Sequence, residues 1–564
     1  MHKVDEREAA SLHSLMSALP TMPALLQHFG QPSPGKRFSL LQIAIVLIAG
    51  GTHALSMAWP FPFGFTQGQP VWWLQVVALG LLAGQLDAQV RYRSWKRAAW
   101  LGGLFATAML CGTFWWLFIS MHTYGGLAAP LTLLAVVLLA ALLGLYYAAA
   151  SGLFVLLAPA RRVWRAIVFA ALWLLAELAR VKFFTGFPWG EGGYAHVDGW
   201  AQPLAAWVGV HGLSFLAAFA AAWLVMSLRV YRARWTTALC IALVSVAVSW
   251  LPLQAGFQVG ATPAAPGTLS VTLLQGNIPQ NEKFESGTGV ATALSWYGEQ
   301  LRAASGALVV APETAIPLLP KQLPDDYWQA LKARFSKGQQ AALIGLPLGD
   351  SETGYANSVL GLKPVEPLDP VQPESSSQPG EPYRYDKHHL VPFGEFIPLG
   401  FRWFTNLMKI PLGDFNRGAA GQESFAWKGQ RLALNICYED LFGEELGARF
   451  IDPALAPTMF VNVSNIAWFG NSVAIDQHLQ ISRMRALEFG RPMIRATNTG
   501  ATAIIDHRGQ VTHSLARHTR GALVGEVEGR SGITPYAWWV SRYGLWPLWG
   551  LALAVVGLAL LRRR

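Results

Sequence analysis

Long apolar segments dominate the first half and the C-terminal end of this 564-residue sequence. Hydrophobic residues make up 52% and charged residues 13% of the chain, whereas an ordinary soluble domain has about 25% charged residues. A helix needs about 20 mostly apolar residues to cross a bilayer core of roughly 30 Å. Segments of this kind lie before Leu253 and after Tyr536. The chain is therefore predicted to be a polytopic α-helical membrane protein.

Eight transmembrane helices are predicted, and the loops between them alternate in charge. The predicted spans are Phe38–Met57, Val71–Leu86, Ala98–Met121, one within Leu127–Ala158, Val163–Leu178, Trp200–Leu228, Trp235–Leu253 and about Trp546–Leu561. Basic residues gather at Lys36–Arg37, Arg91–Arg97, Arg161–Arg165, Arg229–Arg234 and Arg562–Arg564. Because Lys and Arg are enriched in cytoplasmic loops, both termini are predicted to be cytoplasmic and the region Ala255–Arg530 to lie on the far side.

Four parts of the chain follow from these spans. Residues 1–37 are predicted to be a cytoplasmic N-terminal tail without a cleavable signal peptide, and residues 38–253 contain seven transmembrane helices. Residues 254–530 form a separate globular domain, and residues 531–564 contain the last span and a basic cytoplasmic end. The net charge of +10 belongs mainly to the loops, and without a basic stripe on a soluble face no nucleic-acid partner is expected.

The globular domain alternates short aliphatic runs with helical patterns, which indicates an α/β layered fold. Strands are predicted at Leu269–Leu274, Ala307–Val310, Ala341–Leu346, Ser358–Leu362, Leu432–Ile436, Met459–Val463 and Ala501–Ile505. Helices are predicted at Ala291–Ala304, Asp325–Phe335 and Ser472–Phe489. The stretch Pro364–Pro382, rich in Pro, Ser and Glu, is predicted to be a disordered surface loop.

Cys437 is the only cysteine outside the apolar segments, since Cys111 and Cys240 lie within predicted spans. A cysteine in an apolar helix is most often a small packing residue. An exported cysteine without a partner is either buried or reactive. A reactive thiol needs a base or a nearby cation, because the thiolate is the nucleophile.

Two further motifs at predicted strand ends supply such groups. Glu313, in Ala311–Ala315, could take the thiol proton, and Lys387, in Tyr385–Glu395, could supply the cation. Each residue also has a purely structural interpretation: a core cysteine, a carboxylate beside a helix N-cap, and a solvated hairpin lysine. His388 and His389 are assigned to structure, because no Cys or His partner stands at zinc spacing.

These motifs together resemble the Glu-Lys-Cys triad of the nitrilase superfamily, and the whole chain resembles the bacterial apolipoprotein N-acyltransferase family. The resemblance rests on Pro312–Ala315, Lys387–Glu395 and Ile436–Glu439, and extends to Gln275–Gln280, Asn465–Gly470, Arg483–Glu488 and Thr185–Trp189. It implies an αββα sandwich domain on the periplasmic side of a multi-pass protein of the bacterial inner membrane. No cofactor or metal is expected, and a monomer is predicted.

The resemblance also implies a reaction. Cys437 would take a fatty acyl chain from the sn-1 position of a phospholipid, with phosphatidylethanolamine the expected donor, and form a thioester. The chain would then pass to the α-amino group of a diacylglyceryl-cysteine apolipoprotein. Glu313 would act as the general base, and Lys387 would stabilise the oxyanion.

Supporting or substrate-binding roles are implied for Glu395, Tyr438, Glu439, Phe284, Trp189 and Trp468. Phe284 differs from the family pattern, which often has Trp at this place, so only an aromatic acyl contact is expected there. The aromatic segment Phe393–Phe415 is expected to be a lid that dips toward lipid; the alternative is a hydrophobic edge packed on the domain.

Glu177 lies within a predicted span, where an ionisable residue suggests function. Arg180, three positions on, favours a structural intrahelical pair instead. Two other classes of function remain open from the sequence. A membrane-tethered carbon-nitrogen hydrolase would use the same triad with water as the acceptor. A transporter or receptor would need further intramembrane polar residues.

Overall fold

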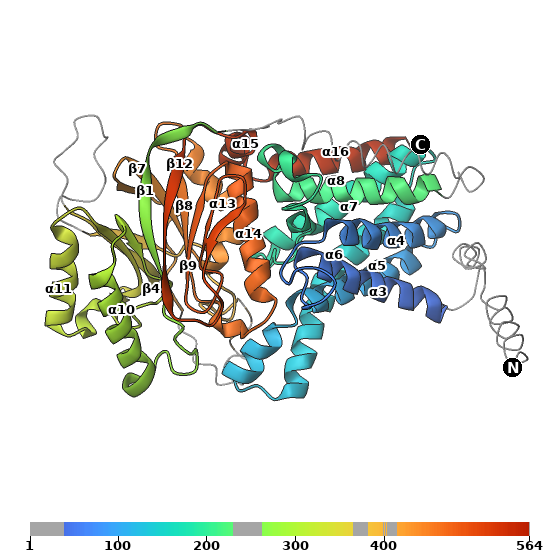
Figure 1. Cartoon of the computed structure of the whole chain (residues 1–564). Coiled ribbons are helices and arrows are strands. Elements are labelled where there is room, and N and C mark those ends of the chain that lie inside the picture. The colour runs from blue at the N-terminus through green and yellow to red at the C-terminus, as the bar shows by residue number, and fades with distance from the viewer. Residues whose placement is uncertain are drawn as a thin grey trace, which may run out of the picture.

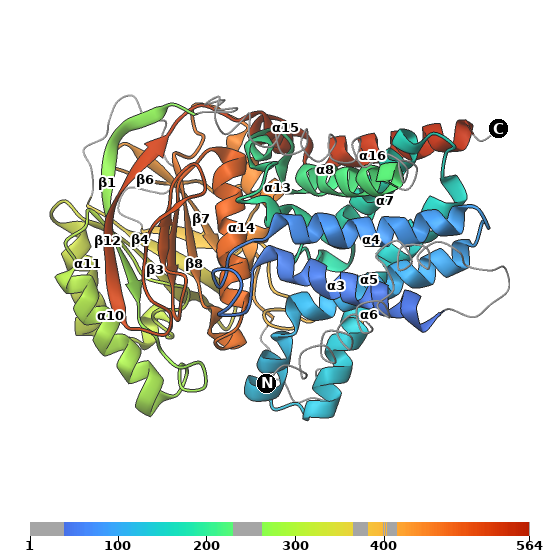
Figure 2. The same ribbon diagram turned by 45° about the vertical axis from the view of Figure 1, so that its right-hand side comes forward.

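The computed structural model describes residues 39–228, 262–364, 382–398, 400, 402 and 414–562. It consists of a helical bundle and an α/β domain, which lie side by side with helix α14 (Ala474–Phe489) between them (Figures 1 and 2). Several predictions lie outside the described residues: the N-terminal tail, the seventh span with Cys240, most of Pro364–Pro382, and most of the lid segment after Ile397.

The bundle contains seven helices among the described residues: α3 (Leu40–Met57), α4 (Trp72–Val90), α5 (Trp95–Phe114), α6 (Ala129–Leu157), α7 (Arg162–Lys182), α8 (Ala205–Leu228) and α16 (Trp546–Leu561). By length and composition, α3, α6 and the stretch Gln202–Leu228 could each cross a membrane. Helix α15 (Pro535–Tyr543) meets α16 at 86°, and this bent pair could be a fourth span. The described residues thus show three to four candidate spans rather than eight.

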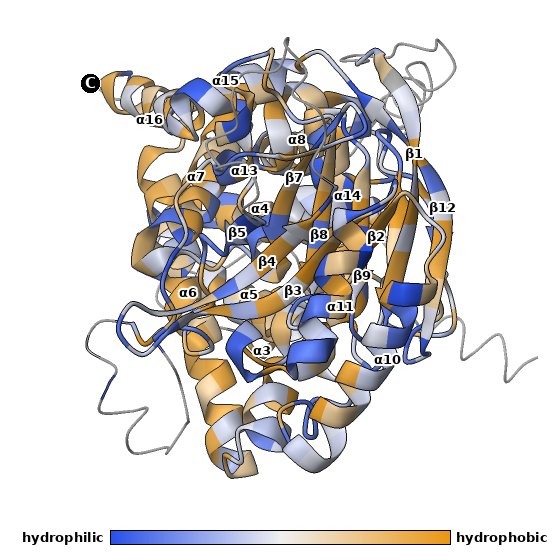
Figure 3. Cartoon of the chain, turned by 90° about the vertical axis from the view of Figure 1, so that its left-hand side faces the viewer, coloured by the Kyte–Doolittle hydropathy of each residue, from blue (hydrophilic) through white to orange (hydrophobic). Residues whose placement is uncertain are grey.

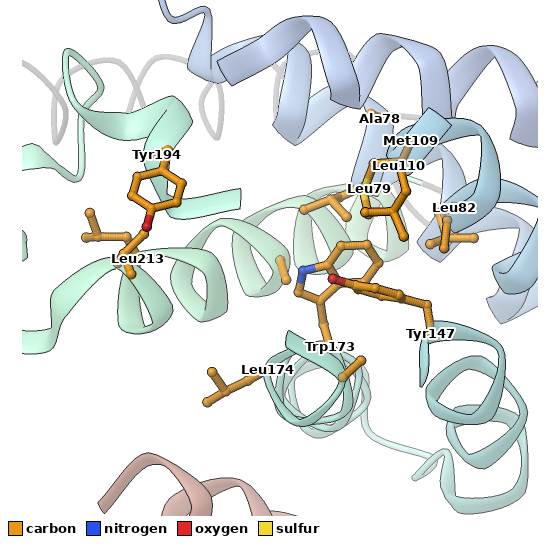
Figure 4. Close-up of a cluster of buried hydrophobic side chains, with 14 of the residues drawn as sticks. Ala78, Leu79, Leu82, Met109, Leu110, Tyr147, Trp173, Leu174, Tyr194 and Leu213 are labelled. Atoms are coloured by element: carbon orange, nitrogen blue, oxygen red, sulfur yellow. The ribbon is translucent and has the colours of Figure 1, made fainter. Parts of the chain in front are cut away.

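Large aromatic side chains fill the centre of the bundle. Trp173 of α7 packs against Tyr147 of α6, with ring centroids 4.7 Å apart, beside Leu79 of α4 and Leu110 of α5 (Figure 4). Helices α5 and α6 approach so closely that a Cβ on Gly102 would collide with the Ser151 hydroxyl. Small residues allow such close contacts between membrane helices.

Glu177 and Arg180 of α7 do not form the predicted pair. Glu177 accepts hydrogen bonds from Trp173 Nε1 and the Gly192 N–H at 3.2 and 3.1 Å. Arg180 donates to the carbonyls of Phe187 and Trp189 at 3.0 and 2.7 Å. The prediction was wrong because the loop after α7 folds back over the helix end and offers both side chains backbone partners.

The α/β domain is built on two six-stranded sheets. The first has the order β12-β1-β2-β3-β4-β5 and the second β11-β10-β9-β8-β7-β6. The first sheet contains β1 (Ala264–Gln275), β2 (Leu308–Val310), β3 (Ala341–Asp350), β4 (Gly354–Leu362), β5 (Tyr383–Asp386) and β12 (Gly521–Arg530). The second contains β6 (Phe425–Trp427), β7 (Gln430–Ile436), β8 (Met459–Ser464), β9 (Met493–Thr497), β10 (Ala503–Ile505) and β11 (Val511–Ser514).

Three parallel strands form the centre of each sheet, β1-β2-β3 and β7-β8-β9, with antiparallel strands outside them. Residues such as Val271, Leu308, Leu434 and Val461 form one buried core from both sheets. Helices α10 (Ala291–Ala303) and α11 (Asp325–Ser336) cover the first sheet, and α13 (Gly443–Gly447), α14 and α15 lie against the second. Figure 1 shows these layers edge-on, and Figure 3, viewed from the side of α10 and α11, shows hydrophilic residues on both helices. The domain is therefore an αββα sandwich.

Helix α14 joins the domain to the bundle through buried polar side chains. Gln477 accepts hydrogen bonds from Trp116 Nε1 and Trp189 Nε1 at 3.0 and 2.8 Å, and donates to the Thr113 carbonyl. Gln480 donates to the Gly68 carbonyl at 2.8 Å. Further contacts link Arg483 to Asp198 and Glu488 to the Val210 N–H. Buried polar groups require such partners, so these bonds fix how the two parts dock.

We predict that Gln477→Ala destabilises the protein by about 1–3 kcal/mol, because the buried Trp189 N–H loses its acceptor. Trp116 keeps its bond to the Thr113 carbonyl, so only one donor is left without a partner. Thermal unfolding in detergent should show a lower melting temperature. Gln339→Ala, at an exposed glutamine, is the matched control, and an equal effect there would contradict the prediction.

Candidate active site

Three predicted site residues meet where strands of the two sheets end. Glu313 follows β2, Lys387 follows β5, and Cys437 follows β7. Cys437 has a positive φ of 53°, and Thr314, next to Glu313, has a φ of 50°. Such strained conformations cost about 1–3 kcal/mol each and tend to occur at functional sites.

A buried polar network holds the strained Cys437 peptide. The Cys437 carbonyl accepts from Asn462 Nδ2 at 3.3 Å and lies 3.2 Å from His478 Nε2. Arg495 NH2 lies 3.0 Å from His478 Nδ1, and because a guanidinium only donates, Nδ1 must accept. The proton of His478 is therefore on Nε2, which faces both the Cys437 carbonyl and Asp440 Oδ1.

Cys437 is half-buried, and its thiol is protonated at neutral pH. Burial, together with the Glu313 carboxylate, raises the pKa of this thiol to about 12, and Lys387 opposes the shift. The resting site therefore holds a thiol rather than a thiolate. A nearby base must remove the proton when the sulfur attacks.

Glu313 is placed and charged to act as that base. Its Oε1 accepts from Asn357 Nδ2 at 2.7 Å, and its Oε2 accepts from the Asn465 N–H at 2.8 Å. Burial alone would raise the pKa of Glu313, but Lys387, the Asn357 amide and a further buried lysine outweigh burial and hold the pKa below its ordinary value. Glu313 is consequently a carboxylate at neutral pH.

Lys387 lies between two carboxylates. Its Nζ is 2.9 Å from Glu395 Oε1 and 3.4 Å from Glu313 Oε1, and its side chain is 1% exposed. Burial would lower the pKa of Lys387, but the two carboxylates raise it above the ordinary value of a lysine. Asn357 bridges the same two carboxylates, donating to Glu395 Oε1 at 2.8 Å. The ammonium is therefore permanent and fixed in position.

Glu439 ties the loop of Lys387 to the loop of Cys437. It accepts from the N–H groups of His388 and His389 at 2.7 and 3.1 Å, from Tyr385 Oη at 2.9 Å, and from the Ile436 N–H at 2.6 Å. Four donors on one carboxylate fix the distance between the two loops.

Tyr438 connects the nucleophile to the bundle. Its hydroxyl donates to the Gly186 carbonyl at 3.2 Å, and its ring stacks on Phe187. His389 stacks on Phe442 and lies 2.9 Å from Glu445 Oε1, and His388 lies 2.8 Å from the Gly418 carbonyl. Both histidines thus make structural contacts. The described part of the chain contains no cluster of His, Cys, Asp or Glu suited to a metal ion.

The three predicted aromatic contacts lie in different surroundings. Phe284 is 59% exposed and Trp468 is 41% exposed, with the Trp468 ring edge-on to Tyr124 after α5. Trp189 is 3% exposed and packs against Trp116 and His478. The exposed rings of Phe284 and Trp468 can contact a ligand. The buried ring of Trp189 packs against His478, which lies beside the Cys437 carbonyl.

Several residues of the site were missed by sequence reasoning: Lys283, Asn357, Asp440, Asn465 and His478. Asn357 and Asp440 lie near the ends of predicted strands. A polar residue at such a place could have indicated that it belongs to the site. Lys283 lies three positions after the end of the Gln275–Gln280 motif, among polar residues, so it resembled a solvated lysine. His478 is one helix position from Gln477, and nothing local indicates that it reaches the Cys437 carbonyl.

This arrangement suits covalent acyl transfer. A thiol nucleophile stands with a carboxylate base and a fixed ammonium, all supplied by strand ends of one domain. A carboxylate base can accept the thiol proton, and a buried ammonium can stabilise negative charge on a carbonyl oxygen.

Two protein families and several known proteins are similar in sequence to this chain. Residues 54–223 match the family described as apolipoprotein N-acyltransferase N-terminal domain, and residues 270–535 match carbon-nitrogen hydrolase. Apolipoprotein N-acyltransferase of Verminephrobacter eiseniae is 58% identical over 89% of this chain and 93% of its own length. Those of Ralstonia nicotianae and Bordetella bronchiseptica are 42% and 41% identical, over 87% and 93% of this chain and 90% and 97% of theirs. The chain belongs to the apolipoprotein N-acyltransferase family.

Proposed function

We propose that the protein transfers a fatty acyl chain from the sn-1 position of a phospholipid, through a Cys437 thioester, to the α-amino group of a diacylated apolipoprotein. The observation that carries this proposal is the site of Glu313, Lys387 and Cys437 beside the membrane bundle. All three residues come from one chain, which supports a monomer as the active unit.

In the first half-reaction the Cys437 sulfur attacks the ester carbonyl carbon as its proton passes to Glu313. The oxygen of the tetrahedral intermediate carries the negative charge, which the Lys387 ammonium stabilises. The carbon–oxygen bond to glycerol then breaks, and the departing oxygen takes the proton from Glu313. The products are a lysophospholipid and a thioester on Cys437.

In the second half-reaction the uncharged α-amino group of the apolipoprotein attacks the thioester carbon. Glu313 takes a proton from the attacking nitrogen, and Lys387 again faces the oxyanion. The carbon–sulfur bond breaks, and the proton on Glu313 returns to the sulfur. An amide is formed, and the site regains its starting protonation state.

The location of Cys437 supports lipid substrates. The adjacent Tyr438 bonds to Gly186, in the loop after α7, so the sulfur lies beside the membrane part of the molecule. Exposed aromatic rings, Phe284, Trp468 and Phe393, provide apolar surface for acyl chains. Phosphatidylethanolamine is the proposed donor, and both substrates would remain in the bilayer during transfer.

We also propose eight membrane spans, cytoplasmic termini and a periplasmic catalytic domain in the bacterial inner membrane. One end of the bundle gathers basic residues: Arg165 pairs with Asp87 at 2.7 Å, and Arg562 lies over the Trp164 ring at 4.6 Å. The α/β domain is at the other end, away from the C-terminus (Figure 1). The positive-inside rule favours a cytoplasmic location for the basic end.

Cysteine labelling tests this orientation. In a chain whose native cysteines are replaced by serine, Ser351→Cys on the β3–β4 turn should react with an impermeant maleimide in spheroplasts. Lys96→Cys at the basic end should react only after the membrane is opened. Both positions are exposed, and the reverse labelling pattern would refute the proposed orientation.

The acyl transfer is tested with phospholipid labelled at either the sn-1 or the sn-2 chain and a diacylated lipopeptide. We predict transfer of the sn-1 label only, with rate losses of about 10²–10⁴-fold for Glu313→Gln and about 10²–10³-fold for Lys387→Met. Cys437→Ser should abolish thioester formation. Glu299→Gln, Lys337→Met and Cys111→Ser are the matched controls and should keep near-normal rates.

The same assay separates the transferase from a carbon-nitrogen hydrolase that uses water. The transferase should release little free fatty acid and hold its label until the lipopeptide is added. Rapid release of fatty acid without acceptor, and no amide product with it, would favour the hydrolase.

The pH dependence of thioester formation should follow the ionisation of the Glu313 carboxyl group. Its carboxylate form accepts the proton, and its pKa lies below the ordinary glutamate value of about 4.3. The rate should therefore be level from about pH 5 to 7 and fall only at lower pH, as Glu313 becomes protonated. A half-maximal rate near neutral pH would point to a different base.

A further inference from the structure

Lys283 is a second buried lysine beside the proposed triad. It is 2% exposed, and its Nζ donates to the backbone carbonyl of Glu313 at 3.1 Å. The next residue, Phe284, is 59% exposed, so the chain turns the lysine inward and the aromatic ring outward. Burying an ammonium is costly unless a negative partner is near, so the position of Lys283 requires an explanation.

The charges of the site explain it. Two buried carboxylates, Glu313 and Glu395, share the single ammonium of Lys387 through direct contacts. Lys283 adds a second ammonium and makes this group of four neutral. Counted together with Cys437, the site remains neutral when the thiol proton moves to Glu313, because one negative charge passes from oxygen to sulfur.

The neighbouring carboxylates have partners of their own. Asp440 lies between His478, at 3.0 Å, and Arg495, at 3.5 Å. Glu439 accepts four hydrogen bonds from the loops around it. The positive charge of Lys283 therefore interacts with Glu313 and Cys437.

We propose that Lys283 is a positioning residue for the general base: its ammonium holds the Glu313 backbone and balances the second carboxylate, so that Glu313 stays ionised and Cys437 can release its proton. This role rests on the proposed acyl transfer. The pKa of Lys283 agrees with it, because burial lowers it to about 8 while Glu313 and Cys437 oppose the shift. Lys283 thus keeps its charge at neutral pH.

Two variants separate charge from packing. Lys283→Gln keeps an N–H donor but removes the charge, and Lys283→Met keeps the apolar stem but removes both. Lys283→Gln combined with Glu395→Gln removes one charge of each sign and restores neutrality. Lys337→Gln, at an exposed lysine, is the matched control.

The test uses the full-length protein in detergent, with Cys111 and Cys240 replaced by serine so that Cys437 is the only thiol. The rate of iodoacetamide alkylation of Cys437 at pH 7, followed by intact mass, reports the thiolate fraction without any acyl transfer, at a pH where Lys283 is charged. Thioester formation from phosphatidylethanolamine against pH reports Glu313. Thermal unfolding identifies any variant that does not fold, in which case the other single variant is used.

We expect Lys283→Gln and Lys283→Met to slow this alkylation by about tenfold or more, because a thiol pKa higher by about one unit leaves a tenfold smaller thiolate fraction. The low-pH fall in thioester formation should move upward in the same variants. The double variant should recover at least half of both changes, and Lys337→Gln should show neither. If Lys283 had only a structural role, removing the negative charge of Glu395 would not reverse the effect of Lys283→Gln.

A thioester rate that falls equally at every pH, with its midpoint and the alkylation rate unchanged, would overturn the proposal and leave Lys283 a packing residue. Changes that the double variant does not reduce would overturn the charge balance. If the unaltered chain forms no thioester while alkylation is slower in the Lys283 variants, the proposed acyl transfer fails and the role of Lys283 toward the thiol stands. If thioester forms and neither the alkylation rate nor the thioester midpoint changes, only the role of Lys283 fails.

Discussion

The buried contact of Lys387 with Glu313 and Glu395 is the interaction on which the site depends. An unpaired buried charge is strongly destabilising, and removing one partner of a buried pair typically costs about 3–5 kcal/mol. The three side chains come from segments after β2 and β5, so the pair forms only when the first sheet is complete. Its position fixes the base and the cation in front of Cys437 before any substrate binds. Electrostatic preorganisation of this kind is a major source of catalysis.

The second constraint is the seam between the α/β domain and the bundle. Helix α14 contributes His478 to the Cys437 carbonyl and Gln477 to the tryptophans of the membrane part. One helix thus supports the strained nucleophile from one side and fixes the bundle on the other. Tyr438 makes a second link, through Gly186. The geometry of the thiol is therefore tied to the membrane part, where lipid substrates would arrive.

Sequence patterns predicted the strands that precede Glu313 and Cys437, because each residue follows a short aliphatic run, whereas Lys387 follows the polar Tyr383–Asp386 segment, for which no strand was predicted. The seven predicted strands are confirmed as β1, β2, β3, β4, β7, β8 and β10. Strands β5, β6, β9, β11 and β12 were not predicted. In β12, Glu and Gly interrupt the apolar pattern, and its partner β1 lies some 250 positions earlier in the chain. Lys283 and Asn357 were missed because their burial is set by contacts distant in sequence. The helical pair of Glu177 and Arg180 failed for the same reason: loop carbonyls and N–H groups replaced the local partner.

The central claim is that Cys437 carries the fatty acyl chain between two lipids. Its most direct test is the intact mass of the protein isolated from membranes, followed by fragmentation to locate any adduct. The account predicts a mass increase of one fatty acyl group on Cys437, lost when a diacylated lipopeptide is added and absent from Cys437→Ser. An adduct on another residue, or full lipoprotein acylation by Cys437→Ser, would contradict it.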